Sequence, residues 1–210
     1  MPLLYLVRHG QTDWNAEGRM QGHSDRPLNT LGRIQAAAIG SRLSTAPLTS
    51  IYTSDLQRAR HTADAIARYH NLPVQVDERL REVGFGAWEG AHMEELAERH
   101  PIELAGWRMD PPHYLPEGAE TPQQVNRRVA RFISDLRALP QDERILIVAH
   151  GLTLRTLMGL VAPWPYQRRR EVVENASLST IQLYPDHAVV MSLNDRAHLV
   201  EVDQILAVAQ

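Results

Sequence analysis

Short runs of apolar residues mark the expected strands of this chain. The two clearest runs, 3–7 and 144–149, are almost continuously apolar, which is the pattern of strands buried on both faces of a sheet. Shorter apolar or alternating runs indicate further strands of the same kind. The complete set of expected strands is 3–7, 51–53, 74–76, 144–149, 177–183 and 189–193.

Apolar residues at helical spacing predict helices between these strands. Thr121, Pro122 and Gln124 supply an N-cap, a first-turn proline and the glutamine of a capping box, so a helix begins there. Asn29 and Ser54 are the N-cap residues of two earlier helices. The expected helices cover about 30–43, 55–69, 92–100, 122–139 and 153–160.

This alternation of strands and helices is typical of an α/β fold, a three-layer sandwich in which helices flank a mostly parallel central sheet. A chain of 210 residues suits one domain, so we expect a single domain over 1–210. Residues 101–120 are rich in proline and are expected to be irregular. At about twenty residues, this stretch is too long for an idle connection in a compact domain. We interpret 83–120 as a lid-like insertion over the active site.

Two residue types are absent from the sequence. Without Cys, the chain has no disulfide, no thiolate zinc site and no cysteine nucleophile. All 22 basic residues are Arg, so the chain also lacks the lysine of a Walker-type phosphate loop and of a Schiff base. The sequence therefore excludes cysteine phosphatases and P-loop enzymes.

The charge and hydropathy of the chain give no indication of a nucleic-acid or membrane partner. The net charge is −3, which does not suggest a surface for either. No apolar stretch approaches the roughly 20 residues that span a bilayer, and the N-terminus has no basic region of a signal peptide. We therefore expect a cytoplasmic protein.

Charged and polar residues follow the first expected strand. Arg8 and His9 lie where it ends, and open α/β sheets bind ligands at the carboxyl ends of their strands. Gly10 permits a close approach of the backbone, and Thr12 and Asn15 can donate to an anion. Arginine binds phosphate through two N–H groups, and neutral imidazole can accept a phosphoryl group. An isolated Arg-His pair is most often merely solvated, so this prediction depends on the complete RHGxTxxN spacing.

Three later residues are expected to converge on the same edge of the sheet. His150 follows a buried strand just as His9 does. Arg58 lies in the first turns of a helix, where unpaired N–H groups favour anions. Glu82 lies in a loop among apolar residues, where desolvation is expected to raise its pKa and make it a proton donor. Glu89 in the same loop is interpreted as an ordinary surface glutamate.

Together these motifs resemble the histidine phosphatase superfamily, also called the phosphoglycerate mutase-like family. The matching stretches are RHG, SDLQRARHTA, LREVGFGAWEG and a second HG, and the similarity continues through ENASLSTI and LNDRAHL. The resemblance implies that His9 is phosphorylated and that Glu82 donates a proton. It also implies that Arg8, Arg58 and His150 bind the phosphate. Accessory phosphate contacts are implied for Asn15, Gln21 and Gly22.

The leading hypothesis is a metal-independent phosphomonoester hydrolase that forms a phosphohistidine, acts on a small phosphorylated metabolite and needs no cofactor. LREVGFGAWEG resembles broad-specificity phosphatases and α-ribazole phosphatases, whereas cofactor-dependent mutases resemble LNERHYG there. The open alternatives are a 2,3-bisphosphoglycerate-dependent phosphoglycerate mutase and a non-catalytic phosphate-binding module. A zinc hydrolase is disfavoured because the ten histidines show no HExxH-type spacing.

The residues that contact the leaving group are harder to identify. His23 and Arg108 are the further expected substrate-binding residues, and Arg108 would favour a carboxylate. Other side chains belong either to this pocket or to the core, namely Trp14, Met20, Trp107 and Tyr114. The arginine run 168–170 is typical of a solvated face. Members of the family are often dimers, so the resemblance also suggests a homodimer, although no motif identifies an interface.

Overall fold

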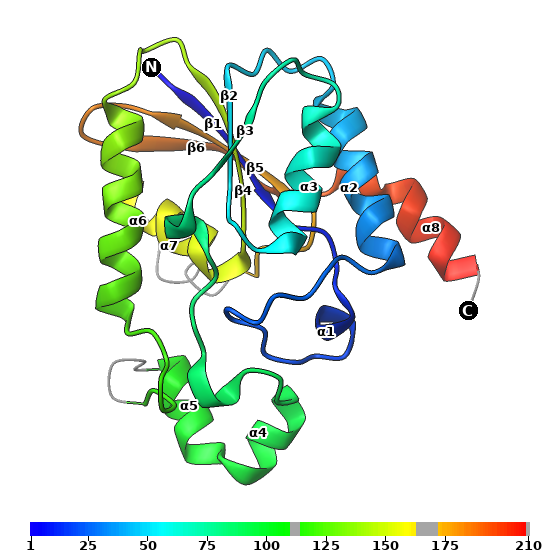
Figure 1. The fold of residues 1–210 in the computed structure, drawn as a ribbon, viewed down its shortest axis with the longest axis vertical. Helices are drawn as coiled ribbons and strands as arrows, with labels where there is room; N and C mark the ends of the chain where they lie inside the picture. Colours follow the sequence, from blue (N-terminus) through cyan, green and yellow to red (C-terminus); the bar gives the residue numbers. More distant parts are fainter. Residues whose placement is uncertain (110–113, 163–171, 209–210) are drawn as a thin grey trace.

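A six-stranded β-sheet forms the centre of the protein (Figure 1). The computed structural model describes residues 1–109, 114–162 and 172–208. The strands are β1 (Leu3–Arg8), β2 (Ser50–Thr53), β3 (Val74–Val76), β4 (Arg144–Ala149), β5 (Leu178–Leu183) and β6 (Ala188–Asp195), and their order in the sheet is β3-β2-β4-β1-β5-β6. All six expected strands are confirmed, each to within about two residues at either end.

The strand pairing makes the sheet mostly parallel. β1 is parallel to β4, β4 to β2, and β2 to β3, whereas β5 is antiparallel to both of its neighbours, β1 and β6. Arg8 at the end of β1 lies opposite Ala149 at the end of β4. His9 and His150 therefore leave the sheet at the same edge, as the parallel arrangement predicted.

Helices cover both faces of the sheet and complete the expected three-layer sandwich (Figure 1). The helices of these outer layers are α6 (Pro122–Arg137) and α7 (Gly151–Val161) on one face, and α2 (Thr30–Leu43) and α3 (Gln57–Ala67) on the other. Within β4, Ile145 and Ile147 join the first apolar cluster, while Leu146 and Val148 join the second. This burial on both faces explains why β4 is apolar at nearly every position.

Helix α3 begins later than the sequence predicted. Ser54 is not its N-cap, because the N-cap position is occupied by Leu56, which makes no side-chain cap. Instead, the Asp25 carboxylate accepts a hydrogen bond of 2.7 Å from the backbone N–H of Gln57, the first residue of the helix. A cap supplied by a distant loop leaves no signal in the local sequence.

Several short elements were not predicted. They are α1 (Asp13–Ala16), α8 (Val200–Val208), the first two residues of α7, and the 3₁₀ turns η1 (Glu78–Leu80), η2 (Gly86–Trp88) and η5 (Ala197–Leu199). No helix in the described ranges is both long and apolar enough to cross a bilayer.

A third apolar cluster lies outside the sandwich, within the segment that was interpreted as a lid. This segment contains α4 (Met93–Arg99) and α5 (Pro101–Met109), beyond the edge at which β1 ends (Figure 1). The expectation of an irregular stretch over 101–120 is wrong for α5. Its proline occupies the first helical position, where the missing N–H is not needed. The cluster buries Met20, Phe85, Trp88, Leu96 and Leu104, and Trp107 packs edge-on against two of its rings.

The turn after His9 packs directly on the start of α2. A Cβ atom on Gly32 would overlap the backbone of Gln11, and one on Gly10 would overlap the carbonyl group of Gly32. Both neighbours are backbone, which cannot move aside as a flexible side chain can. The Gln35 side chain adds a 2.9 Å hydrogen bond from the Gln11 N–H. Helix α2 therefore fixes the path of the chain immediately after His9.

We expect Gly32→Ala to lower the free energy of unfolding by about 1–3 kcal/mol, because the added methyl group forces the two backbones apart. Urea titration of both proteins, with the slope of the transition compared, measures this difference. Gly159→Ala is the matched control, since a Cβ atom there meets nothing within 4 Å. This exposed helical position should gain about 0.5–1 kcal/mol. Equal stability of Gly32→Ala and the unaltered protein would contradict the tight packing.

Candidate active site

His9 is buried directly after β1 and is neutral. It is 2% exposed, and its Nδ1 lies 2.7 Å from the carbonyl oxygen of Gly10. Because a carbonyl oxygen only accepts, Nδ1 carries the ring proton and Nε2 keeps its lone pair. Burial, together with the positive charges of Arg58 and Arg8, lowers the pKa of His9 well below its usual value. The ring is therefore an unprotonated nucleophile at neutral pH.

His150 presents the opposite tautomer. It follows β4, is 0% exposed, and has its ring centroid 5.1 Å from that of His9. The Nε–H of Arg58 donates to Nδ1 of His150 at 3.2 Å, so the proton of the neutral ring is on Nε2. Burial, with the nearby charge of Arg58, lowers the pKa of His150 well below its usual value. Its Nε2–H is buried and has no hydrogen-bond partner among the described residues, which leaves it available to an anion.

Arg58 links helix α3 to the loop that follows β1. Its side chain is 1% exposed, and two of its nitrogens donate to the carbonyl groups of Ser24 and Gly22, both at 2.8 Å. Burial lowers the pKa of Arg58 to about 10, although the carboxylates of Glu82 and Asp25 act in the opposite direction. The guanidinium therefore stays positively charged at neutral pH while it holds the loop in place.

Arg8 is the second cation at this edge. Its Nη1 donates to the carbonyl oxygen of Val173 at 2.5 Å. Burial lowers its pKa, and the charges of Glu82 and Glu174 oppose that effect. Its Nε, like the Nε2 of His150, is buried without a hydrogen-bond partner in the described part of the chain. Two such donors on residues that leave neighbouring strands suit the oxygens of a bound oxyanion.

The carboxylate of Glu82 caps the N-terminus of α7. Its Oε1 accepts from the backbone N–H groups of Val83 at 3.0 Å and Thr153 at 3.1 Å, and its Oε2 accepts from that of Leu152 at 3.2 Å. His150, the N-cap residue, makes no side-chain cap of its own. The partial positive charge of a helix N-terminus favours a carboxylate. The purely apolar surroundings expected for Glu82 are therefore wrong, since N–H donors contact both oxygens.

The two carboxylate oxygens of Glu82 differ in their surroundings. Oε1 also lies 3.3 Å from the hydroxyl of Thr153, so three donors surround it, whereas one described donor contacts Oε2. A Cβ atom on Gly151 would lie 3.6 Å from Nε of Arg8 and 3.8 Å from Oε2 of Glu82. Oε2 is thus the less occupied oxygen and borders the same space as Arg8.

Side chains of the loop after His9 hold one another in place. The buried hydroxyl of Thr12 lies 3.1 Å from Oδ1 of Asn15 and 3.0 Å from Oε1 of Gln21, so its single proton serves two acceptors. Asn175 donates from Nδ2 to the His9 carbonyl at 3.0 Å and to Asn15 at 3.3 Å. Asn175 was not predicted, and its only signal was its place in the ENASLSTI stretch. The phosphate contacts expected of the three loop residues stay predictions.

Glu89 organises the stretch that contains Gly22 and His23. Its carboxylate accepts from the N–H groups of His23 at 2.9 Å, Ser24 at 2.8 Å and Phe85 at 3.1 Å. Gly22 has a φ of +54°, and a Cβ atom there would overlap this carboxylate, so the position requires glycine. The interpretation of Glu89 as an ordinary surface residue is therefore wrong.

The remaining expected residues stand farther from the two histidines. His23 is exposed, and its Nε2 donates to the main-chain carbonyl of Glu82 at 2.9 Å. Arg108 belongs to α5, but its side chain lies outside the described residues, as does the run 168–170. Across ranges 1–109, 114–162 and 172–208, no three or more His, Asp or Glu side chains are grouped so that they could hold a metal ion.

The lowered pKa values predict a pH-dependent stability. An unfolded histidine takes up a proton below about pH 6.5, whereas His150 in the folded protein stays neutral to a lower pH. The unfolded state then binds more protons, so the free energy of unfolding is maintained above about pH 6.5 and falls as the pH drops below it. We expect His150→Gln to reduce this acid loss by up to ~1.4 kcal/mol per pH unit.

Urea titrations at several pH values between about 7.5 and 5.5 measure the effect across the ordinary histidine pKa. His61→Gln, at an exposed position on α3, is the control and should leave the pH dependence unchanged. The same reduction in both variants would rule out the buried neutral ring as the cause.

Comparisons with known proteins agree with this arrangement. A sequence profile of the histidine phosphatase superfamily (branch 1) matches residues 4–196. A curated protein of Klebsiella pneumoniae, named "Probable phosphoglycerate mutase GpmB", is 39% identical over 183 residues, which cover 85% of this chain and 83% of that protein.

Solved structures give the same result. YhfR of Bacillus stearothermophilus has a TM-score of 0.86 and 34% identity, and the match covers 95% of this chain and 100% of that one. The alpha-ribazole phosphatase of Shigella flexneri has a TM-score of 0.82 and 32% identity, and the match covers 93% and 97%. The sequence resemblance and the fold are thereby confirmed, and the chain belongs to the histidine phosphatase superfamily.

Proposed function

We propose that the protein is a metal-independent phosphomonoester hydrolase that acts on a small phosphorylated metabolite through a phosphohistidine. The observation that carries this proposal is the pair of complementary tautomers. His9 offers a lone pair at Nε2, His150 offers an N–H at Nε2, and the ring centroids are 5.1 Å apart. A nucleophile beside a donor and two guanidinium groups provides the charge stabilisation that phosphoryl transfer needs.

The charge balance supports a phosphate monoester as the substrate. Such a group carries about −1.5 to −2 charge at neutral pH, and Arg8 and Arg58 supply two positive charges. Arg58 contributes mainly its charge, because three of its nitrogens already donate to protein atoms. Nε of Arg8 and Nε2–H of His150 are the donors to the phosphoryl oxygens. The accessory contacts in this proposal are Thr12, Asn15, Gln21 and the backbone of Gly22.

The reaction follows two steps in which the protons balance. In the first, Nε2 of His9 attacks phosphorus, the ester P–O bond breaks, and the departing alkoxide takes a proton from Glu82. In the second, water attacks the phosphohistidine, its proton passes to Glu82, the P–N bond breaks and phosphate leaves. Glu82 thus returns to its starting state, and a positioned acid–base group of this kind gives about 10²–10⁴ in rate.

The oxygen of Glu82 that carries this proton is Oε2 in our proposal. It has one described donor against three for Oε1, so a proton there displaces fewer hydrogen bonds. It also shares the space over Gly151 with Nε of Arg8, which binds the phosphoryl group. The leaving-group oxygen, attached to that phosphorus, then lies within reach of the acid.

The segment 83–120 acts as a lid in this proposal, within a single domain over 1–210. It begins directly after Glu82 and continues from the edge of the sheet at which β1 ends (Figure 1). Its apolar cluster includes Met20 from the loop after β1, which ties the lid to the phosphate-binding loop. Trp14, with the guanidinium of Arg26 4.6 Å from its ring centroid, stands beside Gly90 and is a candidate wall for the alcohol moiety.

Phosphoglycerate mutase activity is the second candidate, because the name of the 39% identical Klebsiella protein points to it. A mutase would use the same phosphohistidine but would return the phosphoryl group to a second hydroxyl of the substrate instead of to water. The stretch around Glu82, LREVGFGAWEG, favours the hydrolase. A name that includes phosphatase for the similar Shigella structure supports the same choice.

We expect His9→Ala to abolish phosphate release from every ester, since no other unprotonated imidazole nitrogen stands beside the donors. The assay is phosphate release in excess EDTA from p-nitrophenyl phosphate, phosphoserine, α-ribazole phosphate and 3-phosphoglycerate. The last ester is tested with and without 2,3-bisphosphoglycerate. Primed conversion to 2-phosphoglycerate without phosphate release would favour the mutase, and activity that survives His9→Ala would overturn both candidates.

Glu82→Gln should slow the hydrolysis of alkyl phosphates by about 10²–10⁴, because the departing alkoxide loses its proton donor. The effect on p-nitrophenyl phosphate should be much smaller, since p-nitrophenolate leaves without a proton. Values of kcat/KM for a series of esters with leaving groups of increasing pKa measure this trend. Glu143→Gln, far along the chain at the start of β4, serves as the control. An equal loss on every ester would remove Glu82 from the role of acid.

A further inference from the structure

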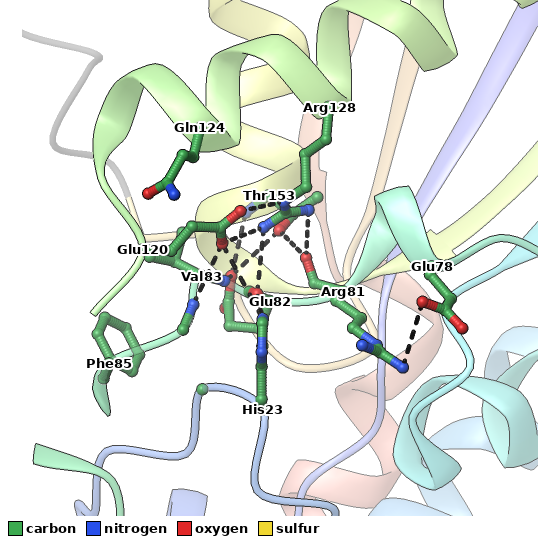
Figure 2. Close-up of polar contacts among 12 residues, drawn as sticks. His23, Glu78, Arg81, Glu82, Val83, Phe85, Glu120, Gln124, Arg128 and Thr153 are labelled. Atoms are coloured by element: carbon green, nitrogen blue, oxygen red, sulfur yellow. Dashed lines mark hydrogen bonds and ion pairs between the residues drawn. The ribbon is translucent and has the colours of Figure 1, made fainter. Parts of the chain in front are cut away.

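Arg128 of α6 binds the backbone of the segment that carries Glu82 (Figure 2). Its Nη1 donates to the carbonyl oxygens of Arg79 and Arg81 at 2.7 Å each, and its Nη2 donates to that of Glu82 at 3.1 Å. The remaining bonds go to Glu120, from Nε at 2.7 Å and from Nη2 at 2.9 Å. Arginine has five N–H groups, so every donor of this side chain is used.

This contact differs from an ordinary surface ion pair. The side chains of Arg128 and Glu120 are only 16% and 15% exposed. Glu120 also bonds to Gly84, which follows Glu82 closely: the Gly84 N–H lies 3.3 Å from its carboxylate, and its own N–H donates to the Gly84 carbonyl at 2.8 Å. The Arg128–Glu120 pair therefore holds the chain on both sides of Glu82, where backbone carbonyls have no strand partner.

The main chain and the carboxylate of Glu82 are held by different helices. Its carbonyl oxygen accepts from Arg128 on α6 and from His23, whereas its carboxylate accepts from the N-terminus of α7. Figure 2 shows these groups gathered around Glu82. Two anchors on separate helices fix both ends of one side chain, which limits where its Oε2 can lie. A misplacement of about 1 Å is enough to slow a reaction roughly 10²-fold.

We propose that Arg128, held by Glu120, is a positioning residue that sets where Glu82 delivers its proton. This inference rests on the proposed role of Glu82 as the acid–base group. Lysine cannot take this place, because a compact ammonium with three donors cannot reach three carbonyl groups and a carboxylate from one plane. Glu120 stands at the end of segment 83–120, so the pair also connects the base of the proposed lid to the acid.

The first test compares kcat/KM of Arg128→Lys on two kinds of ester. We expect a loss of about 10- to 100-fold on alkyl phosphates, which need a proton on the departing oxygen. The loss on p-nitrophenyl phosphate should be much smaller. Arg127→Lys, at the exposed neighbouring position on α6, is the matched control and should leave both esters unchanged. A uniform loss on both kinds of ester would overturn the positioning role.

A double variant tests whether Arg128 acts through Glu82. When Arg128→Lys is added to Glu82→Gln, we expect no further loss on alkyl phosphates, because the group being positioned has already lost its proton. Multiplying losses would mean that Arg128 acts elsewhere, which overturns the proposal. If Arg128→Lys does not fold, Glu120→Gln replaces it, since this variant removes the ion pair and leaves the carbonyl contacts. It should show the same leaving-group dependence at smaller size.

These outcomes separate the inference from the proposed function. Activity that survives His9→Ala would overturn the phosphohistidine mechanism, whatever Arg128→Lys does. If His9→Ala is inactive and Glu82→Gln shows the leaving-group dependence, the proposed function holds. Equal activity of Arg128→Lys and Arg127→Lys on alkyl phosphates would then overturn the role of Arg128 alone.

Discussion

The burial of the Arg58 guanidinium against His150 is the interaction on which the rest of the site depends. A buried charge is unfavourable unless hydrogen bonds replace the lost water. Two carbonyl groups of the loop after β1 and one imidazole nitrogen replace it here. The same contact places the ring proton of His150 on Nε2, and its charge contributes to the lowered pKa of His9. One side chain thus determines a loop position, a tautomer and the protonation of the nucleophile.

The charges of the site are coupled to one another. Arg8 and Arg58 are close enough for Arg8 to lower the pKa of Arg58, and the negative charge of Glu82 counteracts this effect on both arginines. Protonation of Glu82 would remove that counter-charge and leave the pocket more positive. An anionic phosphate and a neutral Glu82 therefore favour each other by simple electrostatics. This coupling would place the proton on the acid when the substrate is bound, which is when the leaving group needs it.

The sheet and the central residues were predictable because their signals are local. Buried parallel strands are apolar at nearly every position, and they end at a common edge, so Arg8, His9 and His150 could be placed together from the sequence. The supporting contacts were not predictable, since they join a side chain to backbone groups far along the chain. The caps by Asp25 and Glu82, the carbonyl contacts of Arg128 and the role of Glu89 all belong to this class. Helix α5 was missed because nearby prolines indicated an irregular stretch, although its own proline begins the helix.

The central place of β1 in the sheet has a consequence for how the protein is made. The ribosome releases β1 near the beginning of synthesis, yet its two partners, β4 and β5, are among the last segments to emerge. Until then, the apolar side chains of β1 have no sheet to join, and strand pairing over such sequence distances is slow. A nascent or truncated chain that stops before β4 therefore exposes an unpaired apolar strand, which is prone to aggregate. It also lacks His150 and Asn175, so the nucleophile stays without its pocket until most of the chain has been synthesised.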